Sequence, residues 1–189
     1  MLYSVLADIY EKIEATTKRG EMTALLVELL KNSDIEVIDR VVYLTQGKLC
    51  PDYVGLELGI AEKLALRALS TASGFSIKAL EDMLGRLGDI GIVAEEALSK
   101  GKATSILDFF GAEEAARQAL TVERVYDTFM KIAKATGEGS QEFKISQLSA
   151  LLKDAKPKEA KYIMRTITGK LRLGIADMTI LDALAIAFG

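Results

Sequence analysis

Apolar residues recur along most of this chain at the three- and four-residue spacing of an amphipathic helix. In the first stretch they are Leu2, Val5, Leu6, Ile9, Tyr10 and Ile13, and the same spacing returns over residues 22–30. This spacing places the apolar side chains on one face of a helix. Strand-type alternation is not evident over comparable lengths. We therefore predict an all-α fold.

Further helices are expected along the rest of the chain, at 35–46, 61–73, 76–84, 89–99, 112–118, 121–135, 145–154, 157–168 and 177–188. Pro157 is well placed for a first helical turn. We interpret Gly85, Gly88 and Gly91 as structural turns, because their spacing matches neither a P-loop nor a dinucleotide fingerprint. The last helix is apolar on nearly every side, so we expect it to be buried in the core or covered by something beyond Gly189.

A short motif occurs twice and divides the chain. Leu58-Gly59-Ile60-Ala61 returns as Leu173-Gly174-Ile175-Ala176, and a Gly-Lys-Leu tripeptide precedes each copy. The first copy carries an insertion between the tripeptide and the tetrapeptide, which the second lacks. We therefore expect one domain over 1–189, built from two related halves of about 1–100 and 112–189 that a loop near 101–111 joins.

Composition limits the chemistry. The 189 residues include no histidine and the single cysteine Cys50, so we predict no metal site, and imidazole cannot serve as a general base. No stretch approaches the roughly 20 apolar residues that span a bilayer. The opening Met1-Leu2-Tyr3-Ser4 lacks the basic start of a secretory signal. We expect a cytoplasmic protein.

The net charge of −3 hides a strongly basic segment. Between Lys153 and Arg172 seven cations face two acids, a local charge of 7 − 2 = +5. The segment is either a surface for an anionic partner or a solvated helix face, and the sequence leaves both open.

Two glycines are candidates for phosphate contacts. A glycine-led turn that opens a helix leaves unpaired N–H groups at the positive end of the helix dipole. Gly174 lies close to Lys170 and Arg172, and Gly59 would be its partner with Lys48 nearby. The alternative is that both glycines only permit tight turns.

Two other segments are candidate contacts. Lys18 and Arg19 belong to a basic loop, Thr16 to Gly20, that we expect between the first two helices. The alternative is that this segment is an ordinary solvated turn. Ile106, Phe109 and Phe110 resemble the apolar anchors of peptides that sliding clamps bind, although Ala103 stands where that pattern normally begins with Gln. Core packing would explain the two phenylalanines equally well.

The run Gly169-Lys170-Leu171-Arg172-Leu173-Gly174-Ile175-Ala176-Asp177-Met178-Thr179-Ile180-Leu181-Asp182-Ala183-Leu184 resembles the end of the N-terminal DNA-binding domain of archaeal and eukaryotic ATP-dependent DNA ligases. Residues 10–13, 55–59 and 88–95 extend the resemblance over essentially the whole chain. It implies an all-helical domain with internal pseudo-two-fold symmetry. Such a domain binds the minor groove of nicked duplex DNA while an adenylation domain and an OB-fold domain close around it.

The resemblance also implies roles for individual residues. Gly59 and Gly174 would lie against the backbones on either side of the nick, and Lys18 and Arg19 match the family's basic loop. Beside the second glycine would lie Gly169, Lys170, Arg172 and Ala176. In archaeal members the loop between the halves can recruit the sliding clamp, which Ile106, Phe109 and Phe110 would do here.

The chain departs from a complete ligase in one respect. It contains no Lys-x-Asp-Gly tetrapeptide, which supplies the lysine that takes AMP from ATP. We therefore expect no cofactor in this chain, and ATP with Mg²⁺ in the parent enzyme, which seals nicks in replication, repair and recombination. A helical protein-interaction module without DNA binding is the alternative function.

Overall fold

The chain is helical throughout the part that the structure describes. The structure is a computed structural model, and it describes residues 1–101 and 118–189. These residues form ten α-helices and one short 3-10 helix, and their β-pairing is limited to one antiparallel bridge between Leu2 and Thr121. The predicted all-α fold is confirmed.

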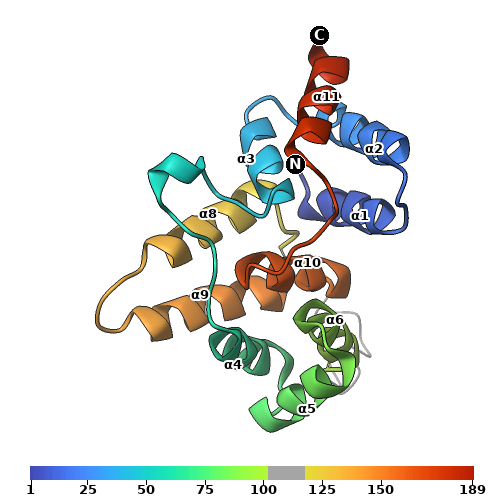
Figure 1. The fold of residues 1–189 in the computed structure, drawn as a ribbon. Coiled ribbons are helices and arrows are strands. Elements are labelled where there is room, and N and C mark those ends of the chain that lie inside the picture. The colour runs from blue at the N-terminus through green and yellow to red at the C-terminus, as the bar shows by residue number, and fades with distance from the viewer. Residues whose placement is uncertain (102–117) are drawn as a thin grey trace.

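The helices are distributed over both described ranges (Figure 1). Residues 1–101 contain α1 (Tyr3–Glu14), α2 (Arg19–Lys31), α3 (Ile38–Thr45), η1 (Asp52–Val54), α4 (Glu62–Ser73), α5 (Ile77–Leu87) and α6 (Ile90–Gly101). Residues 118–189 contain α8 (Val122–Lys134), α9 (Ser140–Asp154), α10 (Pro157–Ile167) and α11 (Asp177–Phe188).

Short polar side chains fix where several helices begin. The Ser76 and Thr121 hydroxyls accept hydrogen bonds from N–H groups in the first turns of α5 and α8, at 3.2 and 3.1 Å. The Asp89 carboxylate accepts two N–H bonds at the start of α6, at 2.8 and 3.1 Å. Each cap satisfies a donor that the helix itself leaves unpaired. Pro157 is the first residue of α10, as predicted.

Some predicted boundaries were wrong. Arg19 and Gly20 belong to the first turn of α2 and not to a loop, and α9 begins at Ser140, five residues before the predicted start. Gly85 lies inside α5, so only Gly88, with φ +69°, ends a helix as a turn glycine. Most of the helix expected at 112–118 falls outside the described residues.

Helices of each half pack against helices of the other half. The helix α4 of the first half packs against α9 of the second, and α11 of the second half packs against α2 of the first (Figure 1). In addition, α10 packs closely against α6, and α1 contacts α2, α10 and α8. One buried core therefore draws residues from both halves. The reciprocal packing agrees with the expected pseudo-two-fold relation, which remains a prediction.

Aromatic residues fill the centre of this core. Tyr10 of α1 and Tyr162 of α10 meet edge to face, with ring centroids 5.4 Å apart, and the Tyr10 hydroxyl lies 3.1 Å from the Thr45 hydroxyl.

The last helix, α11, is only partly covered. Its Thr179, Ile180 and Ala183 are buried, whereas the exposed large side chains are Met178, Leu181, Ile186 and Phe188.

Candidate nucleic-acid interface

The Gly-Lys-Leu tripeptides end α3 and α10 in the same way. Gly47 and Gly169 both adopt φ +71°, a left-handed conformation that favours glycine. The Lys48 and Lys170 N–H groups then donate to carbonyl oxygens five residues earlier, at 2.9 and 2.7 Å. This is the hydrogen-bond pattern of a glycine-terminated helix. The repeated tripeptide therefore forms the same type of helix C-terminus after α3 and after α10.

The connections that follow these two helix ends lie side by side. The Ile60 N–H donates to the Ile167 carbonyl at 2.8 Å, which joins the segment before α4 to the end of α10. A Cβ placed on Gly169 would lie 3.7 Å from the Leu58 carbonyl oxygen. Gly59, Gly169 and Lys170 thereby lie in one region, and Lys48 lines a pocket together with Leu58.

The two tetrapeptides do not form identical turns. Gly174 has φ +69°, whereas Gly59 lies outside the left-handed region. The two copies therefore differ in backbone conformation, and only the first carries an insertion before its tetrapeptide. What the copies share is position: each glycine is exposed and lies three residues before the first residue of α4 or α11.

Both helices after the tetrapeptides begin without a side-chain cap. Ala61 and Ala176 occupy the N-cap positions, and a methyl group cannot accept a hydrogen bond. The first N–H groups of each helix are therefore available to an external acceptor, and the helix dipole favours an anionic one. A Cβ on Gly59 would meet no atom within 4 Å, so its surroundings are open.

The start of α2 lies against the Gly174 turn. A pocket of about 230 Å³ is formed between them, lined by Thr17, Arg19, Met22, Gly174, Ala176, Met178 and Thr179. Lys18 is exposed and precedes α2, and its ammonium lies 3.0 Å from Glu21. The structure thus brings the expected basic loop to the second glycine turn.

Most cations of this surface already have an acidic neighbour. Lys48 pairs with Asp52 at 2.9 Å, Arg19 pairs with Asp182 at 2.7 Å, and Lys170 contacts Glu62. The hydrogen bond that Lys48 donates to the Asp52 carboxylate raises the pKa of Lys48. Arg19 lies 163 residues from Asp182 in the sequence, and Lys170 lies 108 residues from Glu62, so sequence reasoning could not identify these two pairs.

Arg172 differs from the other cations of the surface. Its guanidinium donates to the carbonyl oxygens of Gly169 and Leu171, at 3.2 and 3.0 Å, and the side chain is exposed. Backbone carbonyls carry no net charge, so the full positive charge of Arg172 remains available to an anion.

The basic segment before Arg172 proved to be mainly structural. Lys158 pairs with Asp8 and Glu11, at 3.0 and 2.6 Å, and Arg165 pairs with Glu14 and Asp89, at 2.6 and 2.8 Å. These acids belong to α1 and to the start of α6. The charges of Lys158 and Arg165 are therefore neutralised by acids on the helices that α10 packs against. These two cations form neither a surface for an anionic partner nor a solvated helix face.

Burial and hydrogen bonding act in opposite directions on Asp89. Burial would raise the pKa of its carboxyl, but hydrogen bonds from Arg165 and from the Ile92 and Gly91 N–H groups outweigh it and hold that pKa below the ordinary value. Asp89 is therefore ionised at neutral pH, where it caps α6 and binds Arg165.

Three remaining predictions concern the sliding clamp, a metal site and the membrane. Ile106, Phe109 and Phe110 lie outside them. Within 1–101 and 118–189, no three acidic or cysteine side chains gather as metal ligands would. Among the helices of those same ranges, none combines the length and apolarity that crossing a bilayer requires.

Comparison with known proteins gives the family. Residues 2–185 match the model of the family described as DNA ligase N terminus. The chain is 61% identical to DNA ligase 2 of Thermofilum pendens over 98% of its own length and 31% of that protein's. It is 50% identical to the DNA ligase of Acidianus ambivalens and 48% identical to that of Nitrosopumilus maritimus, over 100% of this chain and 32% and 30% of those proteins. The chain thus spans about a third of its relatives' length, and it belongs to the DNA ligase N-terminus family.

Proposed function

We propose that this chain binds nicked duplex DNA without regard to sequence, through the minor groove and the phosphate backbones. It would do so as the N-terminal DNA-binding domain of an ATP-dependent DNA ligase. The observation that carries the proposal is the surface around the two connections. There the exposed Lys170 and Arg172 and two exposed glycines stand before two uncapped helix starts.

The chemistry of this surface suits phosphate groups. Lys170 and Arg172 offer charged donors, and the open space at Gly59 lets a backbone approach without meeting a side chain. Arg19 and Ala176 line the pocket beside Gly174, and the exposed Lys18 directly precedes Arg19. In the minor groove the base edges present a degenerate pattern of donors and acceptors, so binding there would depend mainly on the phosphate backbones and not on sequence.

The described residues do not fit the cofactors of ligation. No cluster of metal ligands is present in them, and the whole chain lacks the Lys-x-Asp-Gly lysine. ATP and Mg²⁺ would therefore act in the adenylation and OB-fold domains of the parent enzyme, which would close on the duplex that this domain holds. The role of the present residues is to bind and orient DNA.

The test is a titration of labelled nicked duplex with the protein, followed by fluorescence anisotropy at several salt concentrations. Sequence-independent binding of about 10⁻⁴ to 10⁻⁶ M that weakens with salt is expected. Lys170→Ala with Arg172→Ala should weaken binding and flatten the salt slope by up to about 0.9 for each phosphate that the protein no longer neutralises.

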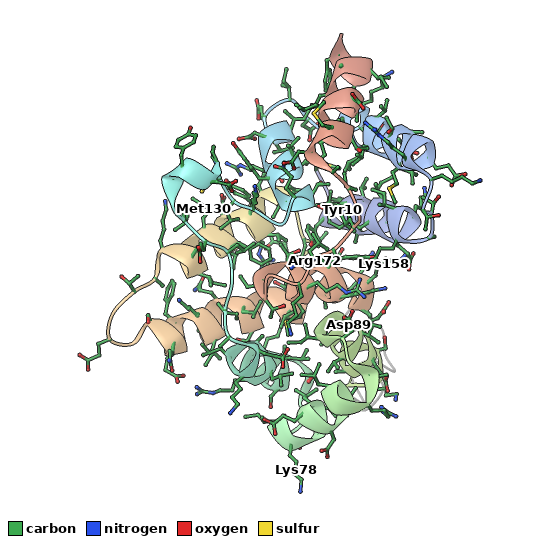
Figure 2. The ribbon with its side chains drawn as sticks, in the orientation of Figure 1. Tyr10, Lys78, Asp89, Met130, Lys158 and Arg172 are labelled. Carbon is green, nitrogen blue, oxygen red and sulfur yellow. The ribbon has the colours of Figure 1, made fainter. Side chains whose placement is uncertain are left out.

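The control removes two cations outside the surface, Lys78→Ala with Lys134→Ala; Lys78 lies on α5, well away from Arg172 (Figure 2). It should leave the slope near that of the unmodified protein. An unaltered slope in the Lys170 and Arg172 variant would reject this site. Absence of duplex binding up to millimolar protein would reject the function and favour a helical protein-interaction module.

A further inference from the structure

Glu62 links the two halves on the candidate surface. It is the first residue of α4, and its carboxylate contacts the ammonium group of Lys170, which follows α10 in the other half. Gln46 makes the reciprocal contact, donating to Asp177 at the start of α11 at 3.0 Å. Each connection is thus tied to the opposite half by a first-turn acid.

We infer that Glu62 competes with DNA phosphate for Lys170. In the free domain the Glu62 carboxylate takes the position that a phosphate oxygen takes in the complex, and this ion pair opens when duplex binds. The inference rests on the proposed function and adds to it a residue that sets affinity. The effect of Glu62 is then to lower the affinity of the domain for DNA.

The exposure of the pair makes the exchange feasible. The Lys170 side chain is 55% exposed and the Glu62 side chain 39%, so both charges are largely hydrated and the pair is weak in water. A duplex presents closely spaced phosphates and releases condensed counterions when a lysine neutralises one of them, a gain that an isolated carboxylate does not offer. The duplex should therefore displace Glu62, at a cost in affinity.

A positioning role for Glu62 makes the opposite prediction. If the carboxylate held Lys170 ready for phosphate, its loss would weaken DNA binding. If it competes, its loss should strengthen binding. The sign of the change therefore separates the two roles, and glutamine is the suitable replacement because it keeps the size of the side chain.

The experiment measures nicked-duplex affinity of Glu62→Gln at several salt concentrations. Removing the ion pair that must open on binding should tighten binding by up to about five-fold, the upper end for an exposed pair. The salt slope should change little, because Lys170 neutralises a phosphate in both complexes. Unchanged or weaker binding would overturn the inference. Binding by the unmodified protein is the reference, so its absence would instead refute the proposed function.

Two further variants exclude a general effect of charge. Glu142→Gln removes the same charge and also breaks an ion pair with a cation on α4, Arg67, at 2.9 Å, but outside the candidate surface. It should bind like the unmodified protein. In a Lys170→Ala background, Glu62→Gln should no longer tighten binding. A gain that persists there would show that Glu62 does not act through Lys170.

Discussion

The contact between α6 and α10 predicts a large effect from adding one methyl group at Gly91. A Cβ there would lie 2.7 Å from the Lys161 carbonyl oxygen and 2.8 Å from Cγ and Nε of Arg165. The carbonyl is part of the α10 backbone and cannot move aside. The Arg165 side chain is only 11% exposed and is held by Asp89 and Glu14, so it cannot move without straining both ion pairs.

These contacts set the size of the effect. Overpacking a core typically costs about 1–3 kcal/mol or more, and disturbing the Arg165 pairs adds to it. Replacing a helical glycine by alanine returns up to about 1 kcal/mol. We therefore expect Gly91→Ala to lower the free energy of unfolding by roughly 1–3 kcal/mol and the melting temperature by about 2–4 °C for each kcal/mol in a domain of this size.

Circular dichroism at 222 nm during thermal and urea unfolding measures the change. Gly85→Ala is the matched control, since Gly85 also lies in a helix but a Cβ on it would meet no atom within 4 Å. That variant should be as stable as the unmodified protein or up to about 1 kcal/mol more stable. Equal stability of the Gly91→Ala and Gly85→Ala variants would show that α6 does not approach α10 this closely.

Three more predictions follow from other residues. Gly59→Ala should leave the melting temperature near that of the unmodified protein and weaken nicked-duplex binding several-fold in an anisotropy titration; equal binding would mean that no backbone approaches there. Because the folded pKa of Asp89 is depressed, its contribution to stability is present above the ordinary value of 3.8 and is lost as pH falls through the lower folded pKa. Asp89→Asn should therefore lower neutral-pH stability by roughly 1.5–3 kcal/mol and reduce the further loss in acid, measured by urea unfolding at pH 7 and pH 2–4. For the proposed clamp contact, Phe109→Ala with Phe110→Ala should abolish binding to a sliding clamp in a pull-down or titration while circular dichroism stays unchanged; retained binding would place the contact elsewhere.

The helices were predictable wherever one face meets the core. Pro157, Thr121 and Ser76 also mark helix starts by local chemistry that the sequence displays. The start of α9 was missed for a physical reason. Its first turn carries polar side chains and follows Gly137 and Gly139, with φ +83° and +76°, so the apolar pattern appears only further along the helix.

The site residues were predictable in kind but not in geometry. The repeated glycines and lysines indicated the two connections, and both connections prove to lie together. The different backbone at Gly59 and Gly174 was not predictable, because φ depends on how the inserted residues 50–57 return the chain to α4. The repeated motif determined the position of each turn before a helix and left its conformation open.

Charge was the least predictable property, and the reason bears on the strength of DNA binding. The acids that neutralise Lys158 and Arg165 come from α1 and the start of α6, so no sequence window around residue 165 contains them. If only the five candidate cations, Lys18, Arg19, Lys48, Lys170 and Arg172, neutralise phosphates, the salt slope cannot be steeper than about 5 × −0.9 = −4.5. A markedly steeper slope would mean that cations outside this set, such as the exposed Lys153 and Lys156, also neutralise phosphates. Because DNA would bind the folded domain, the melting temperature should rise in either case, so the salt slope and not the thermal shift reports how many cations contact phosphate.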